Sequence, residues 1–344
     1  MRSQQAVSTW SGQSGERFAQ LSVFFPGSVV FNEDNIRSLR ASVDKALLGA
    51  SLESGPDRAL YTDAWSAVGD VSVRGQHGSA SVKAICVGGD FFMFHPLYLR
   101  DGNYISPNDV MKDRVVLDEE LAWRLFGSVR LSGFEIMLNN RPFKIAGVVS
   151  RESDFASTMA YTYGAGLFMS FEALSEMTED GANISCYEIV MPDPITGFAK
   201  HILTEAFPNS DVHIIENTSR FSLGNSFAVI SSFGERSMRT DAVSFPYWEN
   251  AARIVEDRLA LLLVLTILFI AFPVVCGVIY TVKIIRFTIK YGRKKVTKVI
   301  DDIDRRKYEK YLIEKEMDVD IDIYNVNDII REVQDENNQT GSTS

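Results

Sequence analysis

The longest uncharged stretch of the chain is the feature that most restricts its fold. Residues Leu259 to Val282 read LALLLVLTILFIAFPVVCGVIYTV, 24 consecutive positions without a charged side chain. As an α-helix this segment would rise roughly 36 Å, against about 30 Å for the hydrocarbon core of a bilayer. An apolar run inside a soluble core is shorter, about 10 to 14 residues. The stretch therefore predicts one transmembrane helix, with a kink rather than a break at Pro273.

Basic residues are distributed unequally around this predicted helix. The twenty residues before it hold three cations, whereas the sixteen residues after it hold seven. The seven are Lys283, Arg286, Lys290, Arg293, Lys294, Lys295 and Lys298. Positive residues that flank a membrane span stay on the cytoplasmic side. We therefore predict a protein of the cell membrane, with residues 1–258 outside the cytoplasm and a cytoplasmic tail from residue 283 to 344.

The net charge of −10 belongs entirely to the outer part. The tail carries 13 basic and 13 acidic residues, whereas residues 1–258 carry 22 Lys plus Arg and 32 Asp plus Glu. A nucleic-acid partner is not expected, because phosphate binding needs clustered cations. The basic run after the span is explained by contact with membrane lipid, through anionic head groups.

Residues 20–244 alternate short helical and strand patterns and are predicted to form one extracytoplasmic domain. A helix is expected from Asn32 or Asp34 to Leu48, because apolar residues recur there at helical spacing. Asp118 or its neighbour is expected to cap a helix from Glu119 to Phe126, which Gly127 ends. Strands Asp70–Arg74 and Ser79–Val87 read as a hairpin with a loop of several residues, and further short strands follow. This mixture predicts an α+β domain rather than a regular βαβ sheet.

The remaining segments are assigned by pattern. Residues 1–19 are interpreted as a linker or the remnant of a stalk, and residues 245–258 as a stalk helix that runs into the span at 259–282. The tail is predicted to be basic, then amphipathic, then disordered from Asp335. Its apolar face consists of Ile300, Ile303, Tyr308, Tyr311 and Leu312.

Motifs for chemistry are lacking in the sequence. The four histidines, His77, His95, His201 and His213, do not have metal-ligand spacing. Asp318, Asp320 and Asp322 begin like a calcium loop, but isoleucines stand where the EF-hand needs its glycine and glutamate, so an extended segment is expected there. The sequence contains no phosphate-binding loop and no nucleophile elbow. We therefore assign no catalytic, cofactor-binding or metal-binding residues and do not expect an enzyme.

Two further groups of residues leave alternatives open. Cys86 and Cys186 could pair, but both lie in strand-like apolar runs, which favours buried free thiols. Cys276 lies within the predicted span. The aromatic residues of 91–98 could form a binding patch, although a contact in the core or between subdomains is favoured.

Several sequence blocks follow one another in a fixed order between Val82 and Val149. They are Asp90-Phe-Phe92, Leu99 to Ser106 with Asp109, Val115 to Ala122, Leu125-Phe-Gly127, Gly133, Ile136 to Asn140, and Phe143 to Val148. These blocks resemble the extracytoplasmic core domain of MacB-type ABC transporter permeases, a domain of the FtsX-like permease family. A weaker resemblance extends from about residue 20 to 256. The blocks are structural and supply no chemistry.

The resemblance implies a MacB-like core domain, a separate cytoplasmic ABC ATPase subunit, and a homo- or hetero-dimer with another permease subunit. The family layout is one helix, this domain and three more helices, so this chain lacks the first and the last two transmembrane helices. Residues 1–30 contain no hydrophobic signal core. Either a transmembrane helix or signal upstream of Met1 is missing or the single helix directs export, and the resemblance favours the first explanation.

Two functions of different classes are therefore expected. The first is a non-catalytic membrane subunit of a MacB/FtsX-type ABC transporter, which couples a cytoplasmic ATPase to the extracytoplasmic domain. The alternative is a single-pass anchored binding or sensor protein that uses the same fold. An enzyme comes third, because no acid–base pair or nucleophile can be identified from spacing.

Overall fold

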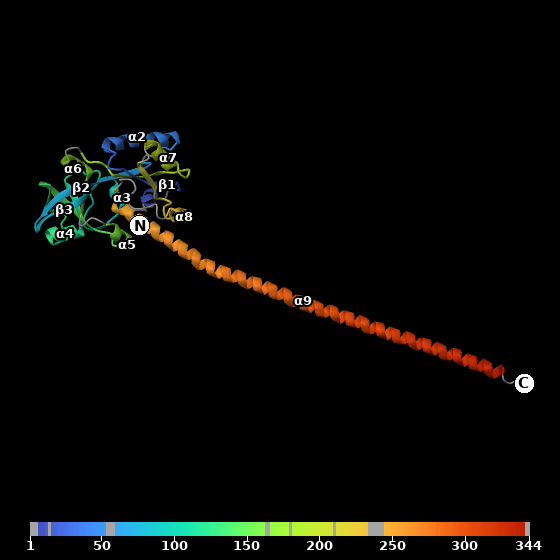
Figure 1. The fold of residues 1–344 in the computed structure, drawn as a ribbon. Helices are drawn as coiled ribbons and strands as arrows, with labels where there is room; N and C mark the ends of the chain where they lie inside the picture. The colour runs from blue at the N-terminus through green and yellow to red at the C-terminus, as the bar shows by residue number, and fades with distance from the viewer. Residues whose placement is uncertain are drawn as a thin grey trace. The chain divides into compact units, whose positions relative to one another are not determined.

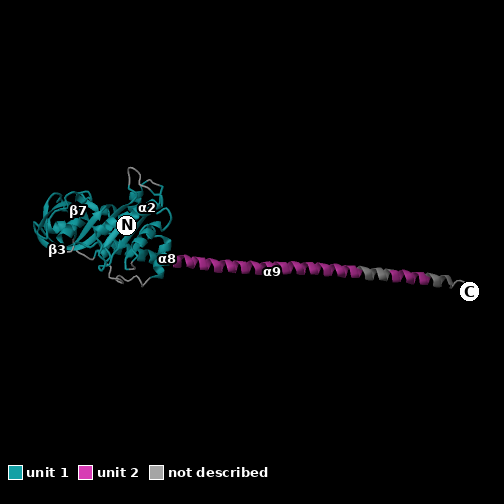
Figure 2. Ribbon diagram, turned by 90° about the horizontal axis from the view of Figure 1, so that it is seen from above, with its two compact units in different colours: residues 1–264 teal, residues 265–344 magenta. Residues whose placement is uncertain are grey.

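The computed structural model describes residues 6–12, 15–52, 59–161, 166–178, 181–208, 211–232 and 244–340. The chain divides into two units, residues 1–264 and residues 265–344 (Figure 2). The first unit is a domain of strands and short helices, and the second consists of helix (Figure 1). The described helices are α1 (Ala6–Ser11), α2 (Glu33–Gly49), α3 (Phe91–Phe94), α4 (Glu119–Phe126), α5 (Phe155–Ala160), α6 (Phe171–Met177), α7 (Phe198–Ala206), α8 (Leu223–Ser231) and α9 (Tyr247–Thr340). The strands are β1 (Phe18–Phe24), β2 (Thr62–Gly75), β3 (Gly78–Gly89), β4 (Tyr98–Gly102), β5 (Arg114–Asp118), β6 (Glu135–Leu138), β7 (Arg141–Ser150), β8 (Gly166–Ser170), β9 (Cys186–Pro192) and β10 (His213–Glu216).

The strands form one mixed sheet. Their order is β10-β1-β9-β2-β3-β8-β5-β7-β4, and β6 pairs with both β2 and β7. Strands β3 and β8 run parallel, as do β5 and β7, whereas the other pairs are antiparallel. The predicted α+β class is confirmed.

The central hairpin is longer and tighter than its sequence pattern indicates. Strand β2 begins at Thr62 instead of Asp70, and Gly75 pairs directly with Gly78 across a two-residue loop. The extra residues of β2 pair with β9, where Thr62 lies opposite Val190. This pairing joins segments far apart in the chain, so the local alternation pattern could not reveal it.

Helices cover both faces of the sheet because its strands alternate apolar side chains. In β5, Val115 and Leu117 join one core cluster and Val116 joins the other. The first cluster contains buried residues of α2, α4, α6 and α7. The second contains residues of α1, α3, α5 and the beginning of α9. The second face is therefore where the long helix joins the domain.

The predicted helix ends are found where the sequence placed them. The Asn32 side chain accepts hydrogen bonds from the backbone of Asp34 and Asn35 and so caps α2. The Asp118 carboxylate accepts from Leu121 N at 2.7 Å and caps α4, which Gly127 ends in the left-handed conformation.

Helix α9 continues further than the sequence pattern predicted. Pro273 lies inside it without ending it, and the helix runs on to Thr340, through the segments expected to be extended at Asp318–Asp322 and disordered from Asp335. Residues 293–340 contain no Gly or Pro, and Arg305 lies within 4 Å of both Asp302 and Glu309 at helical spacing. Residues 341–344 of the predicted disordered end lie outside the described residues. Within the described chain, α9 is the helix long and apolar enough to cross a membrane.

Three short helices were missed in the sequence. Helix α1 lies in the segment interpreted as a linker, and its Ala6 is buried in the second cluster. Helices α5 and α8 have only six and nine residues, and the pattern did not distinguish them from loops.

Candidate functional site

A buried arginine fastens the first turns of α9 to the domain. Arg220, in the loop between β10 and α8, donates from Nη2 to Glu249 Oε1 at 2.8 Å and from Nε to Glu256 Oε1 at 2.9 Å. The two glutamates are seven residues apart and therefore lie two turns apart on one face of α9. Arg253 also donates to Glu249 Oε1, at 2.8 Å. Arg220, Glu249 and Glu256 are all buried.

The electrostatics of this junction keep the arginine charged. Burial alone would lower the pKa of Arg220, but hydrogen bonds and charge from Glu249 and Glu256 outweigh it and raise the pKa. The guanidinium therefore remains a permanent cation opposite two carboxylates. Removing one member of such a buried group leaves an uncompensated charge, which costs more than the pairing itself gains.

The polar contacts continue from Arg220 into the sheet. Arg220 Nη1 donates to Asn217 Oδ1 at 3.1 Å, and Asn217 Nδ2 donates to Ser22 Oγ at 2.7 Å. Ser22 Oγ donates to Glu188 Oε1 at 2.9 Å, and the other oxygen of Glu188 contacts His95 Nε2. A continuous chain of buried side chains thus connects α9 with β1, β9 and the residue after α3. We call these residues the junction network: Ser22, His95, Glu188, Asn217, Arg220, Glu249 and Glu256.

Aromatic packing fixes the same part of α9 from another side. The ring of Trp248 lies 5.5 Å from that of Phe91 and 4.4 Å from that of His95, between centroids. The ring of Tyr247 stacks on Tyr161 at 4.3 Å. Phe91 is 1% exposed, so the aromatic segment at 91–94 forms a core contact with the helix, as its sequence favoured.

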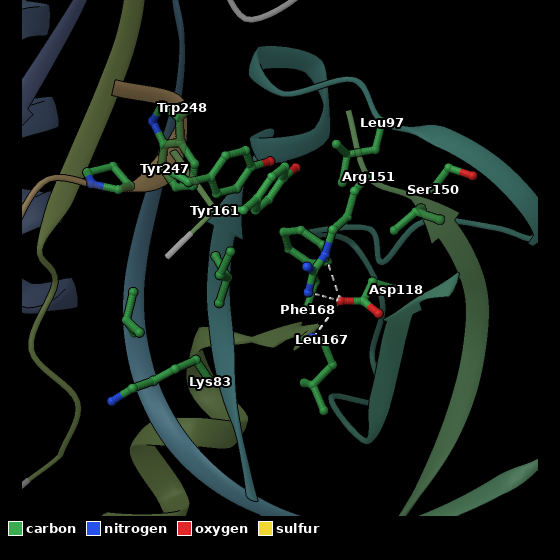
Figure 3. Close-up of a pocket in the computed structure, with 15 residues that line it drawn as sticks. Lys83, Leu97, Asp118, Ser150, Arg151, Tyr161, Leu167, Phe168, Tyr247 and Trp248 are labelled. Carbon is green, nitrogen blue, oxygen red and sulfur yellow. Dashed lines mark hydrogen bonds and ion pairs between the residues drawn. The ribbon is translucent and has the colours of Figure 1, made fainter. Parts of the chain in front are cut away.

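A small cavity lies beside these aromatic rings. Its volume is about 60 Å³. The wall includes Tyr161, Tyr247 and Phe168, and Figure 3 shows Arg151 pointing toward the carboxylate of Asp118 at the rim. Arg151 Nε lies 3.0 Å from Asp118 Oδ2, yet burial raises the pKa of Asp118 above its ordinary value. The cavity has mostly apolar walls, with one ion pair and Ser150, whose Oγ donates to Glu119 Oε2 at 2.7 Å.

The titratable residues singled out in the sequence are not brought together into one site. His95 is buried in the junction network, whereas His201 is exposed. Among the residues that the structure describes, no three His, Cys, Asp or Glu side chains are placed to hold a metal ion. Cys86 and Cys186 are buried free thiols, which agrees with the favoured interpretation.

The junction network was missed in the sequence. Its partners come from β1, β9, α9 and two loops, so no local motif joins them. One signal was present: Glu249 and Glu256, at a helical spacing of seven residues, directly precede the apolar run. Two acidic residues on one helix face need a buried cation if that face packs on a core.

The chain is similar to known proteins in sequence and in structure. The family described as the MacB-like periplasmic core domain matches residues 12–199. The periplasmic region of MacB from Actinobacillus actinomycetemcomitans is similar in structure, with 16% identity, a TM-score of 0.42, and coverage of 58% of this chain and 89% of that one. The extracellular domain of the noncanonic ABC-type transporter YknZ from Gram-positive bacteria shares 14% identity, with a TM-score of 0.40 and coverage of 57% and 99%. No protein with a curated description matches this chain.

Proposed function

This chain belongs to the family of the MacB-like periplasmic core domain, and on that premise we propose that it is a non-catalytic membrane subunit of a MacB/FtsX-type ABC transporter. It couples a separate cytoplasmic ATPase to the extracytoplasmic domain. The sequence has no phosphate-binding loop, so ATP hydrolysis is assigned to the partner.

The observation that carries the proposal is the buried attachment of α9 to the sheet. A helix held by Arg220 and by aromatic packing cannot turn or slide against the domain without breaking buried ion pairs, which costs about 3–5 kcal/mol. A displacement of the helix in the membrane is therefore passed on to the sheet. A loosely tethered domain would absorb the same displacement in its linker.

The proposal also gives each flanking segment a role. Residues 259–282 cross the cell membrane, the domain before them lies outside, and the tail from residue 283 is cytoplasmic, in keeping with its seven adjacent cations. Those cations contact anionic lipid. A second permease subunit, identical or related, completes a dimer.

A pull-down from native membranes in mild detergent, followed by mass spectrometry, tests the coupling. We expect an ATPase in stoichiometric amount, which deletion of residues 299–312 abolishes. Deletion of residues 327–340, a segment of equal length from the same helix, is the control and should retain the partner. Recovery of the chain alone, or with envelope proteins only, would contradict the proposal.

One observation favours the alternative of an anchored binding or sensor protein. A groove of about 410 Å³ is lined by Trp65, Lys112 and Glu172, and by the ion pair of the partly exposed Arg40 with the buried Asp63. Charged groups of both signs and an aromatic wall suit a polar ligand. A neighbouring gene for an ATPase with a phosphate-binding loop would favour the transporter subunit over this alternative.

A further inference from the structure

We propose that helices α5 and α8 rest on the outer surface of the bilayer, through four exposed apolar side chains. These are Phe155 and Met159 of α5 and Leu223 and Phe227 of α8, which we call the collar. The inference goes beyond the coupling role and depends only on the membrane-spanning part of the proposed function.

Each helix of the collar presents one apolar pair to the outside. Phe155 and Met159 are 50% and 58% exposed, and Leu223 and Phe227 are 70% and 53% exposed. Both pairs have a spacing of four residues, so each pair lies on one face of its helix. Other residues of the two helices are buried in the domain: Ala156 and Ala160 in α5, and Val229 in α8. Large apolar side chains exposed in this arrangement indicate a contact surface.

Contacts within the domain place the collar at the level where the span begins. The guanidinium carbon of Arg258 lies 3.5 Å from the ring centroid of Phe155, and Asn225 of α8 donates to Glu256 Oε1 at 3.2 Å. The uncharged run starts at Leu259, directly after Arg258. Figure 1 shows α5 and α8 beside the start of α9. Both collar helices therefore flank the last turn of α9 before its apolar segment.

The position of the collar next to the start of the span indicates what covers it. If Leu259 begins the hydrocarbon region, side chains packed against Arg258 lie at head-group depth, within about one helical turn of 5.4 Å. Arginines extend toward the head groups at this depth, and interfacial helices carry Phe and Leu on their apolar face. An amphipathic helix that lies in the interface buries its apolar face there. Lipid therefore fits the collar as a continuation of the membrane contact made by α9.

A second copy of the chain fits the collar less well. A stable protein interface involves about 20–30 residues on each side. The collar offers four large apolar side chains on two short helices. Contact with a bilayer needs no such area, because the span supplies the affinity for the membrane. The collar sets only the orientation of the domain on the membrane surface.

Fluorescence quenching in a bilayer tests the inference on the full chain. Single cysteines replace Met159 or Phe227 in a Cys276→Ala background and carry an NBD label, since the other two cysteines are buried. The protein is reconstituted into nanodiscs of phosphatidylcholine, with or without a nitroxide on the head group, and for position 275 with a nitroxide on the acyl chain. We expect a loss of NBD fluorescence at both positions with the nitroxide lipid. Leu48→Cys, at the exposed end of α2, is the control without quenching, and Val275→Cys reports on the span.

The outcomes separate the collar from the span. Quenching at 159 and 227 but not at 48 supports the inference. If position 275 is quenched while 159 and 227 behave like 48, the collar does not touch lipid, although the span stands. If 275 is unquenched too, the membrane-spanning role itself is overturned. Self-quenching between labels at 159, regardless of the nitroxide lipid, would assign the surface to a second copy and overturn the lipid contact.

Discussion

At the scale of single residues, Arg220 determines how the long helix is held. Its guanidinium can donate in a fork to two carboxylates at once, which a lysine ammonium cannot do with the same geometry. Glu249 and Glu256 are 2% and 6% exposed, so water cannot replace the lost cation. The role of Arg220 is therefore to neutralise the two buried carboxylates.

Replacing Arg220 by Met should cost about 3–5 kcal/mol of unfolding free energy, because two buried carboxylates lose their cation. Arg220→Lys should cost less, since charge is kept while the fork is lost. The matched control is Arg37→Met, whose partner Asp34 is exposed, and it should leave stability unchanged. Urea unfolding of the full chain in detergent, followed by tryptophan fluorescence, measures all three. Equal effects at 220 and 37 would refute this account of the junction.

The buried thiols make a second residue-scale prediction. Burial raises the pKa of Cys86 and Cys186. Both should resist iodoacetamide at pH 8 in the folded protein and react in urea, as mass spectrometry of the labelled peptides would record. A raised pKa means that the folded state favours the protonated thiol, so its stability should decline as pH rises above about 8.5, the unfolded thiol value. Rapid labelling of the folded chain at either position would contradict their burial.

At the scale of elements, helix α4 shows how local signals fix an end. Gly127 has φ of 68°, and a Cβ there would lie 3.2 Å from His77 Cε1. An L-residue is strained in that conformation, whereas glycine adopts it freely. The turn of the β2–β3 hairpin, where His77 donates its N–H to Leu125 O at 2.9 Å, therefore packs directly on the end of α4.

Gly127→Ala should lower the unfolding free energy by about 1 kcal/mol, because of its positive φ. Gly224→Ala is the opposite case: Gly224 lies in α8 with nothing within 4 Å of an added Cβ. That change should be neutral or stabilise the protein by up to about 1 kcal/mol, since it reduces the entropy of the unfolded chain. Denaturant unfolding of Gly127→Ala and Gly224→Ala under the same conditions measures the two changes in unfolding free energy. A loss at 224 as large as that at 127 would show that the effect is not conformational.

At the scale of the whole molecule, charge is separated by the span. An acidic domain precedes the uncharged run and a run of cations follows it. The transfer of basic flanks across a membrane is disfavoured, so we expect the cations to keep the tail inside. The domain and the tail are therefore expected in different compartments.

Cysteine labelling on intact cells tests this orientation. In a Cys276→Ala background, Val30→Cys should react with a membrane-impermeant maleimide added outside, whereas Ile313→Cys should react only after permeabilisation. Both side chains are exposed, so a difference in labelling reports the compartment. Replacing Lys290, Arg293, Lys294 and Lys295 by Gln should weaken the orientation and give mixed labelling. Labelling of position 313 alone on intact cells would mean that the orientation is reversed.

The sequence by itself determined the features that depend on neighbouring residues. The uncharged run from Leu259 to Val282 identified the apolar helix. The capping candidates at Asn32 or Asp34 and around Asp118 marked the starts of α2 and α4, which Asn32 and Asp118 cap in the structure. The ordered blocks between Val82 and Val149 indicated the family, whose match covers them. Caps, turns and hydrophobic runs depend on residues close together in the chain, so they can be recognised from the sequence alone.

Only the tertiary structure decided which distant segments meet. The extension of β2 to Thr62 depends on pairing with β9, more than 120 residues later. The junction network joins His95, Ser22 and Glu188 to Arg220 and α9, and no spacing in the chain encodes those contacts. The exposed apolar side chains of α5 and α8 point to a membrane contact only because both helices lie beside the last charged turn of α9. Such contacts depend on how the sheet orders its strands, because side chains buried together choose their partners by position in space and not by separation along the chain.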